Sequence, residues 1–290
     1  MVAPNRFHKI GLIRKTNAPN LTPTVEKVQA FLKHHGCEVK HDNDFDRDIL
    51  AAESDLIIVV GGDGSMLNAA RSVVSHNKPM LGINRGGLGF LTDVSPTNFE
   101  DKILAVLKGQ YTEEKRFLLD ITVSSKGTTV GAGSALNDVV LYSGHIARMI
   151  EFEAFIDDQF VFSLRSDGII VSTPTGSTAY SLSGGGPIVS PCLEAVVLVP
   201  MHPHTLSSRP IVVPSHSTIR LKVSEKSELT PRLSCDGQTH FSLTAGDEIL
   251  IKRLKDELVL LHPPGYDYYN VLRQKLNWGQ PLVARETDVH

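Results

Sequence analysis

Residues 55–71 constrain this chain more than any other stretch, because a buried strand, a glycine-rich turn and a helix are expected there in direct succession. Residues 56–60 are five consecutive apolar residues, four of them β-branched, which is typical of a strand covered on both faces. Gly-Gly-Asp-Gly follows at 61–64, and Ser65 is the expected N-cap of the next helix. Such a turn exposes backbone N–H groups beside the positive end of a helix dipole, an arrangement that suits a phosphate.

Asp63 is the unusual residue of this turn. A carboxylate inside an anion site repels phosphate unless it holds a metal ion or accepts a proton. We therefore predict that Asp63 is catalytic. The alternative that a short glycine motif leaves open is a plain turn, in which Asp63 only caps the following helix.

Length and composition set the broad class. A chain of 290 residues suggests two domains, and a net charge of −3 does not indicate a surface for nucleic acid or an anionic membrane. The three separated cysteines, Cys37, Cys192 and Cys235, fit neither a disulfide framework nor a zinc site. No stretch approaches the ~20 apolar residues of a membrane span, and residues 1–8 carry no apolar signal core. We expect a cytoplasmic protein.

Strands and helices alternate over the first 110 residues or so, which favours an open, mostly parallel α/β sheet. Ligands in such sheets bind outside the carboxyl ends of the strands, where the glycine turns at 61–64 and 86–89 fall. Strands are expected at 9–13, 38–40, 56–60 and 79–84, helices from 23 to Gly36, at 66–74 and at 96–109, and an acidic loop at 42–48.

After Tyr111 many short strands at close spacing indicate a β-rich, sandwich-like domain. They are expected at 117–123, 129–135, 138–142, 149–156, 160–164, 168–172, 195–199, 211–213, 218–223, 232–235, 248–253 and 258–261, before a helix at 266–276. We predict an α/β domain over residues 1–115 and a β-rich domain over 116–265. Residues 266–290 are expected to pack back on the first domain.

A dense run of hydroxyl side chains occupies residues 172–183. These hydroxyls, with a short helix that starts at Ser177 or Thr178, would offer neutral donors to a nucleotide. Tyr180 would add an aromatic face or a phenolic hydrogen bond. A flexible Ser/Thr/Gly linker is the alternative, although the embedded apolar residues and the lack of charge count against it.

Other polar groups could serve the same ligand. Asn137-Asp138, at the head of a strand, is a suitable pair for an adenine edge or a ribose diol, with a plain turn as the alternative. Arg148 and Arg165 could each pair with phosphate, although a surface salt bridge is the commoner fate of an arginine. For His202 and His204 we favour a structural role over a shared metal, since no carboxylate or cysteine flanks them.

Taken together, these segments resemble the NAD kinase family, of the type found in Gram-negative bacteria. The matching segments are 61–64, 84–93 (Asn-Arg-Gly-Gly-Leu-Gly-Phe-Leu-Thr-Asp), 136–139, 167–183 and 204–210. The Gly-Gly-Asp-Gly turn alone is shared with lipid kinases and phosphofructokinases, whereas Ser-Thr-Pro-Thr-Gly-Ser-Thr-Ala-Tyr at 172–180 is much more specific. Ser65 departs from the Thr of many relatives but keeps a small hydroxyl.

The resemblance implies transfer of the γ-phosphoryl group of ATP to the 2′-hydroxyl of the adenosine ribose of NAD, giving NADP, with Mg²⁺ on the ATP phosphates and Asp63 as proton acceptor. It also implies a Rossmann-like α/β domain of the phosphofructokinase and diacylglycerol kinase type, and a β-rich, sandwich-like C-terminal domain. The matching binding positions are Asp63, Gly64, Asn137, Asp138, Arg148, Arg165, Asp167, Thr178, Ala179, Tyr180, Ser181, Leu182, Ser183 and Gln238.

The family assembles as a dimer or tetramer, so a homo-oligomer is implied, in which a neighbouring subunit completes the site through Arg165 and Asp167. Two other hypotheses stay open. One is a lipid or sugar kinase that shares the Gly-Gly-Asp-Gly turn, and the other is a non-catalytic sensor that binds NADP(H) with the same loops.

Overall fold

The computed structural model describes residues 5–14, 22–42, 46–84, 89–144, 148–205, 207–227 and 229–278, and the chain divides into two compact units. The first unit comprises Met1–Met66, Pro79–Glu113 and Leu261–His290. The second comprises Leu67–Lys78 and Glu114–Leu260. The domain boundaries expected at residues 115 and 265 stay a prediction.

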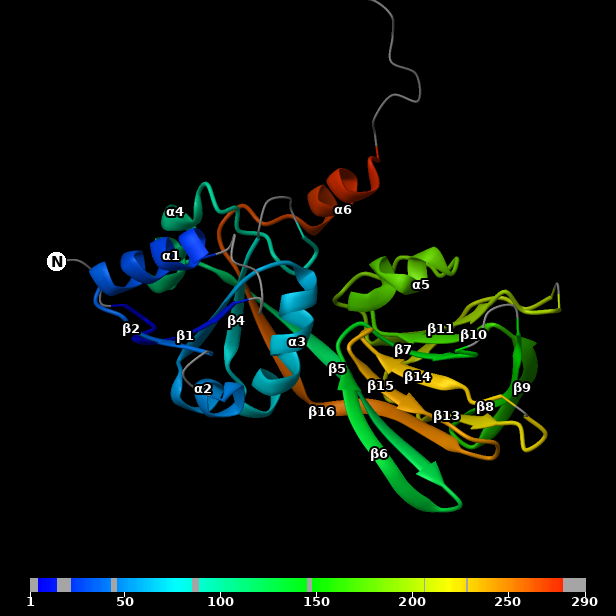
Figure 1. The fold of residues 1–290 in the computed structure, drawn as a ribbon. Helices are drawn as coiled ribbons and strands as arrows, with labels where there is room; N and C mark the ends of the chain where they lie inside the picture. Colours follow the sequence, from blue (N-terminus) through cyan, green and yellow to red (C-terminus); the bar gives the residue numbers. More distant parts are fainter. Residues whose placement is uncertain are drawn as a thin grey trace, which may run out of the picture. The chain divides into compact units, whose positions relative to one another are not determined.

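The first unit is an open α/β sheet. Its strands pair in parallel in the order β2-β1-β3-β4, and Figure 1 shows α1 and α4 on one face and α2 on the other. The rings of Phe31 and Phe99 meet edge to face at 5.9 Å and join α1 to α4. Its elements are β1 (Lys9–Arg14), α1 (Thr22–His34), β2 (Glu38–His41), α2 (Arg47–Glu53), β3 (Leu56–Val60), the start of α3 (Asp63–Val73), β4 (Pro79–Ile83), α4 (Phe99–Leu107) and α6 (Tyr268–Leu276).

Strand β3 positions the glycine turn. All five of its residues are buried, as predicted for a strand between two helical layers. It pairs with β1 on one side and β4 on the other, so its carboxyl end points the 61–64 turn out of the sheet. The structure confirms the open, mostly parallel α/β class for this unit.

The second unit is a β-sandwich. One of its sheets runs β16-β13-β8-β9, with β5 paired to β16 and β6, and the other runs β12-β11-β10-β7-β14-β15. Its elements are η2 (Val74–His76), β5 (Thr112–Ser125), β6 (Thr128–Ala135), β7 (Asp138–Tyr142), β8 (Ile150–Ile156), β9 (Gln159–Ser166), β10 (Gly168–Ser172), η3 (Thr175–Thr178), α5 (Tyr180–Ser183), β11 (Ala195–Met201), β12 (Ile211–Pro214), β13 (Ile219–Val223), β14 (Arg232–Cys235), β15 (Thr239–Ser242) and β16 (Glu248–His262).

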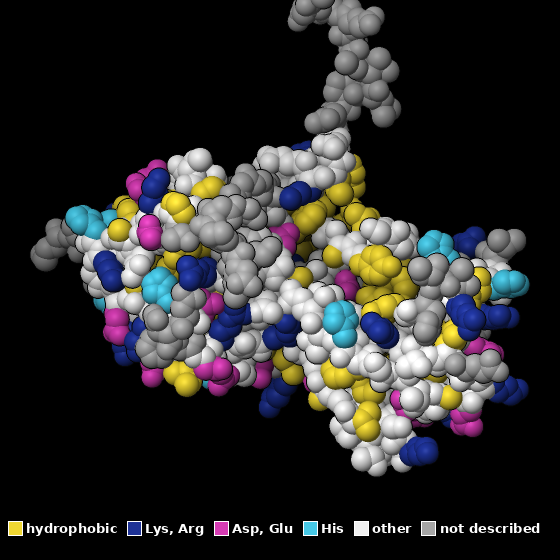
Figure 2. Space-filling view, viewed as in Figure 1, with side chains coloured by type: hydrophobic (Ala, Val, Ile, Leu, Met, Phe, Trp, Pro, Cys, Tyr) yellow, Lys and Arg dark blue, Asp and Glu magenta, His cyan; other side chains and the backbone are white. Residues whose placement is uncertain are grey.

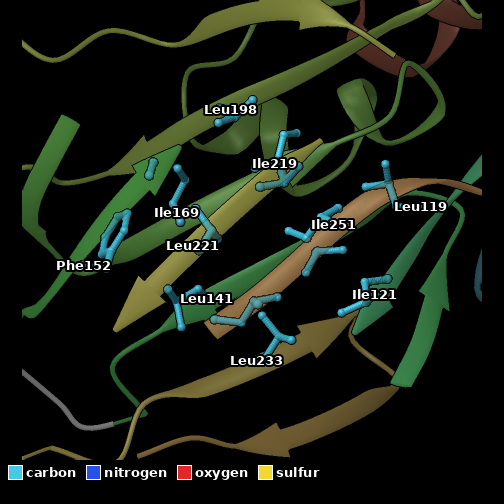
Figure 3. Packing of buried hydrophobic residues seen from close by; sticks show 14 of the residues in the cluster. Leu119, Ile121, Leu141, Phe152, Ile169, Leu198, Ile219, Leu221, Leu233 and Ile251 are labelled. Atoms are coloured by element: carbon cyan, nitrogen blue, oxygen red, sulfur yellow. The ribbon is translucent and has the colours of Figure 1, made fainter. Parts of the chain in front are cut away.

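Apolar side chains from both sheets form the sandwich core, in which Leu141, Leu233 and Ile251 lie together (Figure 3). Because successive strand residues face opposite ways, Val140 lies on the other face of β7, in a separate buried cluster. Figure 1 shows α5 over this face. The β-rich, sandwich-like class is confirmed, and its outer face is where the cavity described below is built.

Three local predictions are wrong. The helix after β3 begins at Asp63, so Ser65 is not its N-cap. Helix α2 starts within the expected acidic loop, where the Asp46 carboxylate accepts the N–H of Asp48. The strands expected at 248–253 and 258–261 are one strand, β16, whose polar middle contains the Arg253–Glu257 ion pair.

Strand β15 was also not predicted, since it has only four residues and none of them is buried, so no apolar run marks it. Within the described ranges, the helices lack the length and apolar character needed to cross a membrane. Figure 2 shows basic and acidic side chains interspersed on the visible face.

Candidate functional site

The carboxylate of Asp63 is fixed by the loop that follows β4. It accepts the backbone N–H groups of Phe90 at 2.9 Å and Leu91 at 3.0 Å. The Thr92 hydroxyl donates to it at 3.3 Å. The side chain is only partly buried, so it is held in place and still accessible. The carboxylate therefore contacts the loop after β4, which differs from the alternative in which Asp63 only caps its own helix.

The loop itself is tied to the end of β4. The Asn84 side chain donates to the Thr92 hydroxyl at 2.8 Å, and the Asn84 N–H donates to the carbonyl of Val94 at 2.8 Å. Gly89 lies so close to Asp63 and Thr92 that a Cβ atom there would overlap both side chains. The segment at 84–93 therefore serves Asp63, although its residues 85–88 lie outside the described ranges.

The glycine turn offers a smaller anion site than predicted. The Gly61 N–H donates to the carbonyl of Ile83 at 2.9 Å and so belongs to the sheet. The Gly62 carbonyl accepts the N–H of Ser65 at 2.8 Å, which closes the first turn of α3. Gly64 is exposed at the second position of that helix. The Gly61 N–H is therefore not a donor toward a phosphate, and the anion site expected at 61–64 lacks it.

A cavity of about 400 Å³ lies on the outer face of the six-stranded sheet in the second unit. Its floor comes from β7, where Asp138, Val140 and Tyr142 alternate onto one face. The residues that line it are Asn137, Asp138, Val140, Tyr142, Ala179, Tyr180, Ser234, Asp236 and Gly237. It has an apolar body with polar groups gathered at one end, the usual construction of a small-molecule site.

Asp236 organises the polar end of this cavity. Its buried carboxylate accepts the N–H groups of Leu136 at 3.0 Å, Asn137 at 2.7 Å and Asp138 at 3.2 Å. The Arg71 guanidinium lies 3.4 Å away. The residue therefore fixes the backbone that presents Asn137 and Asp138, both of which were predicted as site residues.

Two buried carboxyl groups share this end of the cavity. Asp138 is 5% exposed, and this burial, together with the nearby charge of Asp236, raises its pKa to about 7. Burial also raises the pKa of Asp236, while its three backbone donors and Arg71 oppose that rise. The Asp138 side chain is therefore protonated in much of the population near neutral pH, and can donate as well as accept.

Gln238 is oriented by helix α3. Its side-chain oxygen accepts from Arg71 at 2.7 Å and from Asn68 at 3.0 Å.

Asp236 was not predicted, although it starts an Asp-Gly turn between two strands, which is a strong hairpin signal. Asp236 and Gly237 both have positive φ, 53° and 64°, as such a turn requires.

The hydroxyl-rich tract at 172–180 is largely buried, so the linker alternative is wrong. The Thr173 hydroxyl donates to the carbonyl of Leu136 at 2.5 Å. The Ser177 hydroxyl accepts the N–H of Val189 at 3.0 Å. These two hydroxyls therefore hold the tract against its neighbours, and whether the other hydroxyls of the tract contact a ligand stays a prediction.

Only part of the tract reaches the cavity. Ala179 and Tyr180 line it, and Tyr180 is 51% exposed. The predicted residues outside the cavity lining are Thr178, Ser181, Leu182 and Ser183. Gly176 packs so closely on Asn137 that an added Cβ would overlap the Asn137 backbone. The tract thereby supports the Asn137 segment rather than contributing many contacts of its own.

The predicted arginines line a different cavity of the second unit. This cavity of about 560 Å³ contains Arg148, Arg165, His204 and Lys226 among its lining residues. The His204 N–H donates to the carbonyl of Arg165 at 3.0 Å. Among the described residues, the arginines and the Asn137-Asp138 pair therefore line two different cavities.

Asp167 and His202 form an exposed pair, with Oδ2 and Nδ1 3.1 Å apart. Among the residues that the structure describes, no group of three His, Cys, Asp or Glu side chains is placed to hold a metal ion. The structural role favoured for His202 and His204 stays a prediction.

Two protein-family models match the chain. The ATP-NAD kinase N-terminal domain matches residues 47–111, and the ATP-NAD kinase C-terminal domain matches residues 136–262. The NAD kinase of Pseudomonas putida (strain W619) is 47% identical over 293 aligned positions, covering 97% of this chain and 99% of that protein.

Two solved structures are similar throughout. The crystal structure of an NAD kinase from Archaeoglobus fulgidus in complex with ATP matches with a TM-score of 0.74 and 29% identity, over 93% of this chain and 98% of that one. The crystal structure of yeast NADH kinase complexed with NADH matches with a TM-score of 0.84, over 96% of this chain and 90% of that one. At 24% identity the second likeness concerns the fold.

Proposed function

The chain belongs to the ATP-NAD kinase family, and we propose that it carries out the family reaction with Asp63 as the proton acceptor. It is an NAD kinase, which transfers the γ-phosphoryl group of ATP to the 2′-hydroxyl of the adenosine ribose of NAD. The observation that carries the role of Asp63 is the fixation of its carboxylate by the N–H groups of Phe90 and Leu91.

This fixation supports proton transfer for a physical reason. A ribose hydroxyl is a weak nucleophile until its proton is accepted as the new bond forms, which contributes on the order of 10²–10⁴ in rate. Phosphoryl transfer otherwise depends mainly on positioning and on charge stabilisation. Amide and hydroxyl donors hold the Asp63 carboxylate still, while its partial exposure leaves it able to meet the hydroxyl.

The cavity on the six-stranded sheet is proposed to take the adenosine of NAD. Asn137 and Asp138 supply the polar edge for the base and the ribose, and Tyr180 supplies an aromatic wall. Asp138 can donate or accept there, because its pKa lies at about 7. Gln238 is proposed to act beside them in the orientation that Arg71 imposes.

The remaining predicted contacts are also kept as proposals. Arg148, Arg165 and Asp167 are proposed to contact NAD in a homo-oligomer. In support, Arg148 and Arg165 line a cavity whose lining does not include Asn137. The neighbouring positions Gly64, Thr178, Ala179, Ser181, Leu182 and Ser183 complete the proposed set. We also propose a cytoplasmic location, in keeping with three free cysteines.

Mg²⁺ is proposed to arrive on the phosphates of ATP. The described residues include no three-ligand cluster for it, and Mg²⁺ commonly binds through substrate phosphates with few protein ligands. When bound, it would offset negative charge on the phosphates beside Asp63. In this proposal Asp63 keeps its hydrogen bonds to the backbone N–H groups of Phe90 and Leu91.

The experiment is an assay of the full chain with ATP, Mg²⁺ and either NAD, diacylglycerol or a sugar, with NADP read out by a coupled dehydrogenase. We expect NADP, and phosphorylation of lipid or sugar without NADP would reject the proposal. In the same assay Asp63→Asn should lose at least ~10²-fold in kcat while NAD still binds by calorimetry. The exposed Asp101→Asn on α4 is the matched control. Wild type that binds NADP(H) without turnover would instead support the sensor hypothesis.

A further inference from the structure

A buried acid–base pair lies in the first unit, outside every site residue predicted above. His262, the last residue of β16, places its Nδ1 3.0 Å from Oδ2 of Asp93. The two side chains are 4% and 11% exposed. The Tyr266 ring stacks on the imidazole with 3.7 Å between centroids and 10° between planes. The imidazole is therefore fixed both in its plane and at its Nδ1 atom.

Asp93 belongs to the loop that holds Asp63. It directly follows Thr92, whose hydroxyl donates to the Asp63 carboxylate. It directly precedes Val94, whose N–H donates to the carbonyl of Gly82 at 3.3 Å. The contact between Asp93 and His262 thus anchors this loop to the end of β16. The anchor lies between Thr92, which contacts the Asp63 carboxylate, and Val94, which contacts the sheet.

We infer that Asp93 and His262 are a positioning pair for Asp63, a step that rests on the function proposed for Asp63. The pair fixes the backbone at 90–92, so that the N–H groups of Phe90 and Leu91 keep the Asp63 carboxylate aimed. A displacement of about 1 Å in a reacting group can lower a rate by ~10²-fold. Loss of the anchor therefore lowers kcat while the binding of NAD is kept.

Two substitutions at one position separate the hydrogen bond from the packing. His262→Phe keeps a ring to stack on Tyr266 and removes Nδ1, and we expect kcat for NADP formation to fall roughly tenfold with KM for NAD within about twofold. His262→Asn places an amide near the position of Nδ1, so it should recover a large part of the lost kcat. Asp93→Ala removes the partner of Nδ1 and is the second variant, for the case that His262→Phe does not fold. It should show the same loss of kcat with KM for NAD nearly unchanged.

A double-mutant cycle tests whether the pair acts through Asp63. In an Asp63→Asn background, His262→Phe should have no further effect on kcat. A tenfold loss in both backgrounds, or a change in KM alone, would overturn the inference. Leu32→Ala, at a buried position in α1, is the control for lower stability and should leave kcat unchanged. If Leu32→Ala lowers kcat as much as His262→Phe does, the effect of His262→Phe comes from lower stability and the pair has only a structural role.

The experiments distinguish failure of this inference from failure of the proposed function. If Asp63→Asn keeps full activity, the role proposed for Asp63 is wrong. If Asp63→Asn is inactive while His262→Phe and Asp93→Ala both keep wild-type kcat, only the positioning pair is wrong.

Discussion

The carboxylate of Asp236 accepts the backbone N–H of Asn137 at 2.7 Å, across 99 positions of the chain. In return, the N–H of Asp236 donates to the carbonyl of Asp138 at 2.9 Å. The turn after β14 and the segment before β7 therefore hold each other in place. The polar end of the cavity depends on this reciprocal contact.

Asp236→Ala should weaken both folding and NAD binding. It leaves three buried N–H groups without their acceptor, and each such loss costs about 1–3 kcal/mol. We expect the free energy of unfolding to fall by at least ~3 kcal/mol, as measured in urea, and KM for NAD to rise at least ~10-fold. Asp236→Asn keeps one acceptor oxygen and should lose less of both. Equal effects of the two substitutions would contradict this account.

Asp138→Asn should change how stability depends on pH. The Asp138 pKa rises from 3.8 to about 7 on folding, so between these values the folded chain binds one more proton than the unfolded chain. The free energy of unfolding contributed by this group therefore falls as pH rises from about 4 to about 7. Asp138→Asn removes that loss, and the variant should be more stable than wild type at pH 8 by at least ~1 kcal/mol.

The measurement is urea unfolding of wild type and Asp138→Asn from pH 4.5 to pH 8. The difference between them should shrink toward the acid end of the series. Asp120→Asn, an exposed substitution on β5, is the control and should follow the wild-type curve. A constant difference across the series would show that Asp138 does not titrate as described.

Gly89→Ala should inactivate the enzyme more than it destabilises the fold. The new Cβ would overlap the side chains of Asp63 and Thr92, so the loop must move away from the carboxylate. We expect kcat to fall at least ~10-fold. Gly133→Ala on β6 is the matched control, since its Cβ would come no nearer than 3.4 Å to Phe241. If Gly89→Ala retained wild-type kcat, the contact between this loop and Asp63 would be irrelevant to turnover.

The cysteines should differ sharply in reactivity. Cys192 is exposed, whereas burial and the adjacent Asp236 raise the pKa of the Cys235 thiol to about 12. At pH 8 the thiolate fraction of Cys235 is then on the order of 10⁻⁴. Iodoacetamide followed by peptide mass spectrometry should therefore modify Cys192 in the folded chain and leave Cys235 intact until urea is added. Early labelling of Cys235 would mean that β14 opens readily.

Much of the fold follows from local patterns. The five apolar residues at 56–60 could form little but a buried strand, and β3 has those bounds. The β7 and β10 strands were expected at their observed positions, because each is a short apolar run, buried on both faces, that lies between polar or turn residues. Helix α2 was missed because only Leu50 and Ala51 are buried in it, too few to show a helical period.

The candidate site was less accessible to sequence reasoning. Asp63 stood out because its charge conflicts with the glycine turn around it, and Asn137-Asp138 because of its place before a strand. Asp236 and His262 did not stand out, since their importance lies in contacts with residues 99 and 169 positions away. Local spacing carries no information about such pairs.

The acid pair at the cavity gives the protein a further property. A carboxyl group whose pKa lies at about 7 is close to half-titrated at neutrality, and a ribose hydroxyl that donates to its anion would displace the remaining proton. Occupancy by the dinucleotide and the acidity of the solution then form one linked equilibrium. The heat measured when NAD is mixed with the protein should therefore differ between buffers, in proportion to the ionisation enthalpy of each buffer.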